Sequence, residues 1–229
     1  MSADDPSSAL ARGLWLALDA SGPHLRAGSF RDGHWLGGHT AHGPALEQLP
    51  GLLARCLDQA ATRPDALAGF LFCDGPGSIL SLRLGLLSLR VWQRLGHRRQ
   101  GHCPPFITWH SLAFALWSVG GRGTVLLPWK RDTWQSLTAD DPEPVLLDRG
   151  QIAKQPAPLH CLPAARIWTA LPEARPVDPP PLEALPAFGG ETGAWRLTED
   201  PELVAPGATR YRAWEQHRHS AADAPPPAP

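Results

Sequence analysis

The segment from residue 67 to residue 96 limits the fold of this chain more than any other part of the sequence. Residues Leu67 to Cys73 are apolar throughout, as expected for a strand that is covered on both faces of a sheet. The turn sequence Asp-Gly-Pro-Gly-Ser follows at 74–78, and the spacing of the apolar residues after it predicts a helix over about 79–96. A buried strand that leads directly into a long helix is typical of α/β folds, so we expect this class.

The N-terminal part of the chain predicts a small sheet and another helix beside this unit. Leu14 to Leu18 is a short apolar run that ends at Asp19 and predicts a buried strand. Residues 25–30 and 34–40 flank the turn Arg-Asp-Gly, and Asp-Gly between two short runs is a strong hairpin signal. A helix is expected from Pro44 to about Ala61, since proline is favourable in a first turn and apolar residues recur there at spacings of three and four.

The second half of the chain has weaker periodicity. Its expected elements are a strand at 106–109, a helix that ends near Trp117 and a hairpin of strands at 125–129 and 133–138. Residues 156–188 contain many prolines, which favours irregular chain with one short helix around 164–170.

The changes in composition along the chain predict four parts. These are a flexible leader (residues 1–12), an N-terminal lobe that carries the two helices (13–104), a proline-rich C-terminal lobe (105–215) and a disordered tail (216–229). Strand and helix signals alternate in both lobes, whereas the two ends lack them.

The overall charge argues against a chain that binds RNA by itself. It has 21 Lys and Arg against 22 Asp and Glu, whereas neutralising a phosphate backbone usually requires a clear basic excess. A short basic run at Arg98 and Arg99 has the right chemistry, but such runs are usually solvated helix ends. The first residues lack the basic-then-apolar order of a signal peptide, and no apolar stretch reaches the length of a membrane span. We therefore expect a cytoplasmic protein with no membrane partner.

The residue types that carry metal or nucleophile chemistry form no convincing site in the sequence. The four cysteines are widely scattered and include no Cys-x-x-Cys pair. Two histidine pairs, His39 with His42 and His97 with His102, fall in expected strand ends and loops rather than one turn apart on a helix. No Gly-x-Ser-x-Gly or Cys–His arrangement is evident. We therefore expect no metal, no cofactor and no catalytic residue.

The helix predicted over residues 79–96 has two apolar stripes on a helical wheel. One stripe consists of Leu80, Leu84, Leu87, Val91 and Leu95, and the other, nearly opposite, of Leu82, Leu86 and Leu89, with Arg83, Arg90 and Arg94 along one flank. A surface helix needs only one such stripe. Either the helix is buried inside the domain, or one stripe packs on the sheet and the other on another molecule. The pattern favours a partner surface, because leucines left exposed to water lose several kcal/mol of favourable burial free energy.

Several motifs of the chain occur together in a known family. A strand that ends in aspartate followed by small residues reads Leu-Ala-Leu-Asp-Ala-Ser at 16–21, and His42 precedes a leucine-rich helix with Leu-Glu-Gln-Leu-Pro at 46–50. The turn and helix start read Gly-Pro-Gly-Ser-Ile-Leu-Ser-Leu-Arg-Leu-Gly at 75–85. In these motifs the chain resembles TsaB (YeaZ) proteins, whose signature at this turn is Gly-Pro-Gly-Ser-Phe-Thr-Gly-x-Arg-x-Gly. Residues 206–212 are similar to a Pro…Tyr-x-Arg element of the same family.

The resemblance implies an α/β protein with the actin-like ATPase (ribonuclease H-like) fold, in which two lobes each contain a mixed sheet. We expect the second lobe to be reduced, because the resemblance is faint after about residue 140. It also implies a role in tRNA modification, as a non-catalytic scaffold that binds and activates TsaD, the subunit that transfers threonylcarbamoyl to the adenosine next to the anticodon. The tRNA is then reached only through the complex, and a TsaE-like ATPase is a further candidate partner.

In that family the first two helices form the dimerisation surface, either with TsaD or in a homodimer. This implication agrees with the second apolar stripe of the helix over 79–96. The expected interface residues are Leu46, Leu49, Leu53, Leu82, Leu86, Leu89, Arg83 and Arg90.

The departures from the family motifs concern the nucleotide contacts. The residues at 79–81 replace Phe-Thr-Gly, and the segment 128–135 lacks the leading aspartate and the glutamate of its family counterpart. The expected vestigial nucleotide site consists of Asp19, Gly75, Gly77 and Ser78, for which a strand end, a tight turn and a helix N-cap are the simpler interpretation. Two rival functions stay open. One is a small ATPase or kinase of the same fold that depends on Asp19, and the other is a homodimer that has lost the tRNA-modification role.

Overall fold

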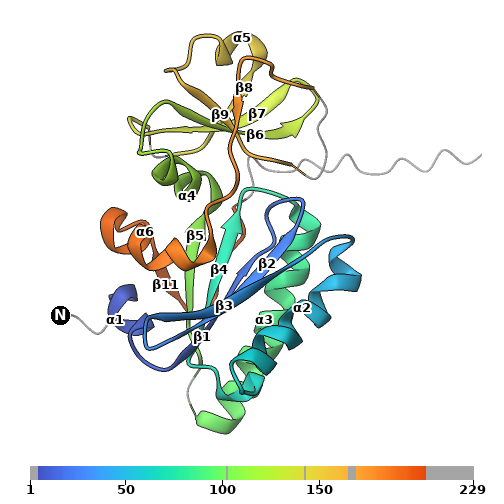
Figure 1. The fold of residues 1–229 in the computed structure, drawn as a ribbon, viewed down its shortest axis with the longest axis vertical. Helices are drawn as coiled ribbons and strands as arrows, with labels where there is room; N and C mark the ends of the chain where they lie inside the picture. The colour runs from blue at the N-terminus through green and yellow to red at the C-terminus, as the bar shows by residue number, and fades with distance from the viewer. Residues whose placement is uncertain (1–4, 102, 142, 165–168, 205–229) are drawn as a thin grey trace, which may run out of the picture.

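The computed structural model, which describes residues 5–101, 103–141, 143–164 and 169–204, has two lobes that are each built on a sheet (Figure 1). The strands of the first sheet are β1 (Leu14–Asp19), β2 (Leu25–Arg31), β3 (His34–Ala41), β4 (Gly69–Gly75), β5 (Phe106–His110) and β11 (Arg196–Thr198). Those of the second are β6 (Thr124–Lys130), β7 (Thr133–Thr138), β8 (Val145–Asp148), β9 (Leu159–Cys161) and β10 (Arg175–Pro176).

Both sheets are mixed. The first has the order β11-β5-β4-β1-β2-β3, with β1, β4 and β5 parallel and their outer neighbours antiparallel. The second has the order β10-β9-β6-β7-β8, with β10, β9 and β6 parallel and β7 and β8 antiparallel. These two mixed sheets confirm the predicted fold class.

The helices cover the first sheet on both faces (Figure 1). The helices of the described residues are α1 (Pro6–Leu10), α2 (Ala45–Gln59), α3 (Ile79–Gln100), α4 (Ser111–Ser118), α5 (Arg149–Ile152) and α6 (Leu185–Thr192), with 3-10 turns η1 (Pro64–Ala66) and η2 (Leu182–Ala184), and α5 lies on the second sheet. On one face α2 packs on β2 and β3, and α3 packs on β4 beside α2. On the other face lie α1, α6 and the start of α4. Every residue of β1 and β4 is buried between these two layers, as their apolar sequences predict.

The predicted hairpin between β2 and β3 has the expected turn. Asp32 has φ 51° and Gly33 has φ 80°, the pair of positive values that a type I′ turn requires. The Asp32 carboxylate also accepts a hydrogen bond of 2.7 Å from the backbone N–H of Gly13, at the start of β1. The Asp-Gly signal therefore fixes both the turn and its attachment to the neighbouring strand.

The second lobe is the smaller one, and its proline-rich part is more regular than we expected. Between 156 and 188 the chain contributes β9, β10, η2 and the start of α6 rather than irregular chain alone. Of the short helix expected around 164–170, residues 165–168 lie outside the described residues, and Thr169 and Ala170 are not helical. Only α4 and the short α5 cover this sheet among the described elements.

The division between the lobes differs from the expected boundary after residue 104. Both β5 and β11 belong to the first sheet, and α6 packs on the same lobe, because the chain enters the second lobe only after α4 and later returns. The expectation of a flexible leader is wrong from Pro6 onward: Asp5 caps α1 by accepting the N–H of Ser7, and Leu10 is buried against the sheet. The expected tail at 216–229 lies outside the described residues.

The orientation of α3 decides which of its two stripes is available to a partner. Leu82, Leu86 and Leu89 are at most 7% exposed and pack against the sheet. Gly85 allows this close approach, since a Cβ there would lie 3.0 Å from Cδ2 of Leu18. Of the opposite stripe, Leu80, Leu87, Val91 and Leu95 point to solvent, whereas Leu84 is half-buried and packs against the core.

We predict that two leucine truncations two residues apart on α3 differ sharply in their effect on stability. Leu89→Ala removes a fully buried side chain and should lower the free energy of unfolding by about 2–5 kcal/mol. Leu87→Ala, at a position that is 62% exposed, should change it by no more than about 0.5 kcal/mol. Urea denaturation followed by circular dichroism measures both. Equal losses would contradict this orientation of the helix.

Candidate functional site

Asp19, at the end of β1, is bonded entirely within the protein. The antiparallel register places Arg26 of β2 directly opposite it, and the two side chains form an ion pair. The backbone N–H and the Oγ of Ser21 donate to Oδ1 of Asp19 at 2.9 and 2.6 Å. Burial raises the pKa of Asp19, but the Arg26 guanidinium and the Ser21 hydrogen bonds outweigh it and hold the pKa below its ordinary value. The carboxylate is therefore ionised and already neutralised by a neighbour.

Arg26 also holds the segment by which the chain returns from the second lobe to the first. Its Nη1 donates to the carbonyl oxygens of Pro179 and Pro180 at 3.1 and 2.6 Å. These prolines cannot donate hydrogen bonds, but their carbonyls accept from a cation that is fixed by Asp19. We call residues 178–181 the return segment. One guanidinium thus joins the end of β1 to this segment across the junction of the lobes.

The Gly-Pro-Gly-Ser turn lies against the same strand end. A Cβ on Gly77 would lie 2.2 Å from the carbonyl oxygen of Ser21, so only glycine fits at this distance. The backbone N–H of Ser78 donates to that carbonyl at 2.8 Å. The Ser78 Oγ lies 2.9 Å from the Oγ of Ser81 and makes no hydrogen bond to the helix backbone. Gly75, two residues before Gly77, has φ 117°, and a Cβ there would lie 3.3 Å from the carbonyl oxygen of Val204.

The four residues expected in a vestigial nucleotide site are thus brought to one region, but their polar groups bind the chain itself. The space left between the lobes at Asp19, lined among others by Trp109 of β5 and Leu127 of β6, has a volume of about 20 Å³. Ligand pockets usually measure roughly 300–1,000 Å³, so this one holds no more than about one water molecule. In this conformation the cleft is closed to a nucleotide.

A second buried carboxylate, Asp74, was not singled out by the sequence. It ends β4, is 1% exposed and forms an ion pair with Arg196 of β11. Burial raises the pKa of Asp74 to about 6, against the lowering effects of Arg196 and the Thr108 hydroxyl. Burial and the Arg196 charge lower the pKa of His110, on the adjacent strand, to about 4. The backbone carbonyl of Asp74 also accepts the N–H of Val204 at 2.9 Å, so this residue attaches the end of the described chain to the sheet.

The outer side of α3 and the first turn of α2 carry exposed apolar side chains. The exposed fractions are 72% for Leu46, 69% for Leu80, 62% for Leu87, 52% for Val91 and 44% for Leu95. We call these five residues the α2–α3 face. It combines the N-terminal turn of α2 with the solvent-facing stripe of α3, and the two helices lie side by side in Figure 1.

Of the eight expected interface residues, five are buried and cannot contact a partner, and two are exposed. Leu49, Leu53, Leu82, Leu86 and Leu89 are all buried in the core between the helices and the sheet. Leu46 and Arg83 are exposed, as an interface requires. Arg90 is half-buried and forms an ion pair with Asp200, and it donates to the carbonyl of Pro201 at 3.0 Å. The stripe of α3 that the sequence analysis assigned to a partner therefore packs on the sheet, and whether either helix binds a partner stays a prediction.

Two further features bear on the classes of function. Within the described parts of the chain, no group of three or more His, Cys, Asp or Glu side chains is arranged to hold a metal ion. None of the described helices is long and apolar enough to cross a membrane. The family element expected at 206–212 lies outside the described residues.

Comparison with known proteins gives a match in structure and none in sequence. No family model matches the chain, and no curated protein matches it. Two solved structures from Pseudomonas aeruginosa do: YeaZ, and a protein described as uncharacterized with similarity to peptidase YEAZ. Each aligns with a TM-score of 0.55 and 19% identity over 84% of this chain and 99% of the other. The chain has the YeaZ fold.

The YeaZ-like fold agrees with the resemblance found in the sequence motifs. At 19% identity the likeness concerns the fold and not the residues of a site. The closed cleft and the α2–α3 face are therefore properties of this chain, established from its own contacts. The cleft is closed to a nucleotide, whereas the outer helices of the YeaZ-like lobe carry exposed apolar side chains.

We predict that Mg·ATP and Mg·ADP do not raise the melting temperature of the protein. The cleft at Asp19 is filled by the ion pair with Arg26 and by the return segment, so a nucleotide would have to displace both. Differential scanning fluorimetry at millimolar nucleotide measures the effect. The Asp19→Asn variant serves as the control. A stabilisation of the wild type that this variant loses would support the rival ATPase or kinase function.

We also predict a pH-dependent contribution of Asp74 to stability. Its folded pKa of about 6 lies above the ordinary 3.8, so the folded state binds more protons than the unfolded state between these values. The contribution of this carboxyl to the free energy of unfolding therefore falls as the pH rises from 4 to 6. The difference between wild type and Asp74→Asn should fall over this range by about 2 kcal/mol. Urea denaturation at a series of pH values measures it, and a difference that rises with pH would contradict the assignment.

Proposed function

We propose that this chain is a non-catalytic scaffold of the YeaZ (TsaB) type, which binds and activates a TsaD-like protein in the threonylcarbamoylation of the tRNA adenosine next to the anticodon. The observation that carries the proposal is the exposed α2–α3 face. Fully burying a leucine or valine side chain is worth about 1.5–3 kcal/mol. An isolated chain forgoes the part of this that belongs to the exposed area of each side chain. A partner that covers the face recovers that free energy.

The fold and the sequence support the same assignment. The YeaZ-like architecture places α2 and α3 as one layer on the outside of the first sheet. The Gly-Pro-Gly-Ser turn at 75–78, which resembles the TsaB signature, leads directly into α3. The near balance of charge favours a protein that reaches tRNA through a complex rather than alone. We therefore infer a cytoplasmic accessory subunit, for which a TsaE-like ATPase is a further candidate partner.

The closed cleft argues against the rival function as a small ATPase or kinase. A kinase of this fold needs an open space for nucleotide beside the aspartate that ends β1, and here Arg26 and the return segment occupy it. The second rival, a homodimer without a role in tRNA modification, would use the same α2–α3 face. The partner experiment below separates it from the scaffold function.

We predict that Leu87→Glu combined with Val91→Glu abolishes the complex with TsaD from the same organism. Each substitution places a carboxylate in the middle of the α2–α3 face, where burial without a partner is costly. Because both positions are exposed in the free chain, the variant should keep the circular dichroism spectrum of the wild type. We expect the dissociation constant, measured by isothermal titration calorimetry, to rise about 100-fold or more.

The matched control is Val145→Glu combined with Leu146→Glu. These side chains are 40% and 42% exposed on β8 of the second lobe, so the same chemical change is made away from α3. The control should bind TsaD like the wild type. If TsaD does not bind and the wild type instead forms a dimer that the α3 variant disrupts, the homodimer function replaces the scaffold function.

A further inference from the structure

The charges along α3 are all of one sign. The helix contains five arginines, Arg83, Arg90, Arg94, Arg98 and Arg99, and neither aspartate nor glutamate between Ile79 and Gln100. Two of them are neutralised by the chain itself, since Arg90 pairs with Asp200 and Arg99 with Asp65. The other three are exposed and form no ion pair with the described residues.

The three unpaired arginines border the exposed apolar stripe. At about 100° per residue, Arg83 and Arg94 lie within about 40° of Leu87 around the helix. Arg98 lies on the line of Leu80, one turn beyond Leu95. A molecule that covers the stripe must therefore approach these guanidinium groups. Bringing them into an interface without partners is costly, because a desolvated cation needs a carboxylate or comparable acceptor.

We infer that the partner of this chain covers the α2–α3 face with an apolar helical surface bordered by aspartate or glutamate carboxylates opposite Arg83, Arg94 and Arg98. This inference rests on the proposed function for the existence of a partner and adds the chemistry of its surface. The apolar stripe supplies the buried area, and the arginines select an acidic border and a direction of docking along α3.

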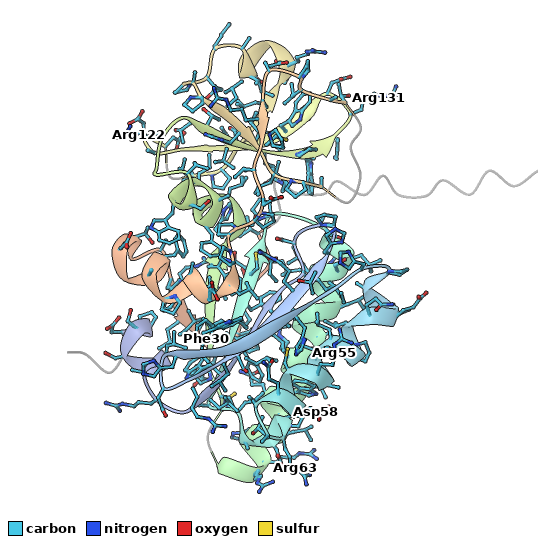
Figure 2. All side chains as sticks on the ribbon, in the orientation of Figure 1. Phe30, Arg55, Asp58, Arg63, Arg122 and Arg131 are labelled. Atoms are coloured by element: carbon cyan, nitrogen blue, oxygen red, sulfur yellow. The ribbon has the colours of Figure 1, made fainter. Side chains whose placement is uncertain are left out.

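The same charges make a second copy of this chain a poor occupant of the face. In a two-fold dimer the same patch meets itself, so α3 against α3 would bring together three unpaired arginines from each copy. Contact of α3 with the partner α2 offers only Glu47 and Asp58 there, beside a further arginine, Arg55. Arg55 and Asp58 are labelled on α2 in Figure 2. Neither arrangement neutralises the arginine border.

The test reverses charge without altering the apolar stripe. One variant carries Arg83→Glu, Arg94→Glu and Arg98→Glu, and the control carries Arg122→Glu, Arg131→Glu and Arg149→Glu. The control arginines are exposed on the second lobe, where Figure 2 labels Arg122 and Arg131. Circular dichroism checks that both variants are folded. Each protein is titrated with TsaD from the same organism at about 50 mM and about 500 mM salt, because screening weakens charge pairs at the higher concentration.

We expect the α3 reversal to raise the dissociation constant at least about tenfold at low salt, and the control to leave it unchanged. We also expect binding of the wild type to weaken as salt rises. If TsaD binds all three proteins equally, the scaffold function stands and the inferred acidic border is overturned.

If TsaD does not bind at all, the proposed function fails, and a mixture of wild type with the α3-reversed variant decides the inference on its own. The reversed copy then supplies the acidic border as the probe. A mixed dimer at low salt, tighter than either self-dimer and lost at high salt, supports the inference. A wild-type self-dimer of equal affinity, or no association in the mixture, overturns it. Analytical ultracentrifugation of the separate and mixed proteins distinguishes these outcomes.

Discussion

The ion pair between Asp19 and Arg26 joins the end of β1, the strand β2 and the return segment. It forms because β1 and β2 are antiparallel neighbours in a register that sets the two residues opposite each other. A buried carboxylate without a partner is unfavourable by several kcal/mol, so the fold depends on Arg26 staying in place. Once held there, the guanidinium also binds the carbonyls of Pro179 and Pro180. The interaction that neutralises the strand end thereby closes the cleft between the lobes.

With the cleft closed, the space between the lobes is too small for a nucleotide. Asp19, Ser21 and Arg26, which line the junction, are bonded to one another, and the backbone N–H of Ser78 donates to the carbonyl of Ser21 rather than to a ligand. On the first lobe, the outer layer formed by α2 and α3 carries the exposed apolar side chains of the α2–α3 face. That layer is fixed from below by leucines in the core and by the close approach of Gly85 to Leu18, so its outward stripe is presented rigidly.

The parts of the fold that follow local rules were predictable, and those that depend on long-range pairing were not. The type I′ turn at Asp32 and Gly33 and the doubly covered β4 were readable from neighbouring residues. The membership of β11 in the first sheet depends on a pairing with β5 about ninety residues earlier in the chain, which no local pattern encodes.

On α3 both stripes consist of leucine and valine, so hydrophobicity could not choose between them. Gly85 was the available signal, since a glycine in a helix interior is costly unless the helix packs closely at that position. The Asp19–Arg26 pair depends on the register between β1 and β2, which the predicted β2–β3 turn does not set.

The arginine border of α3 carries information that the apolar stripe lacks. Leucine and valine side chains pack against almost any apolar surface of suitable shape, so a stripe of them gives affinity with little selectivity. A row of like charges beside the stripe penalises every surface that lacks matching carboxylates, and this includes the surface of the chain itself. Arg90 and Arg99 show how the protein treats guanidinium groups that it can satisfy internally, because each has a carboxylate partner from a different segment. Arg83, Arg94 and Arg98 have no carboxylate partner among the described residues, although they lie beside the exposed apolar stripe of the helix. In the inferred complex, carboxylates of the partner pair with this row of arginines.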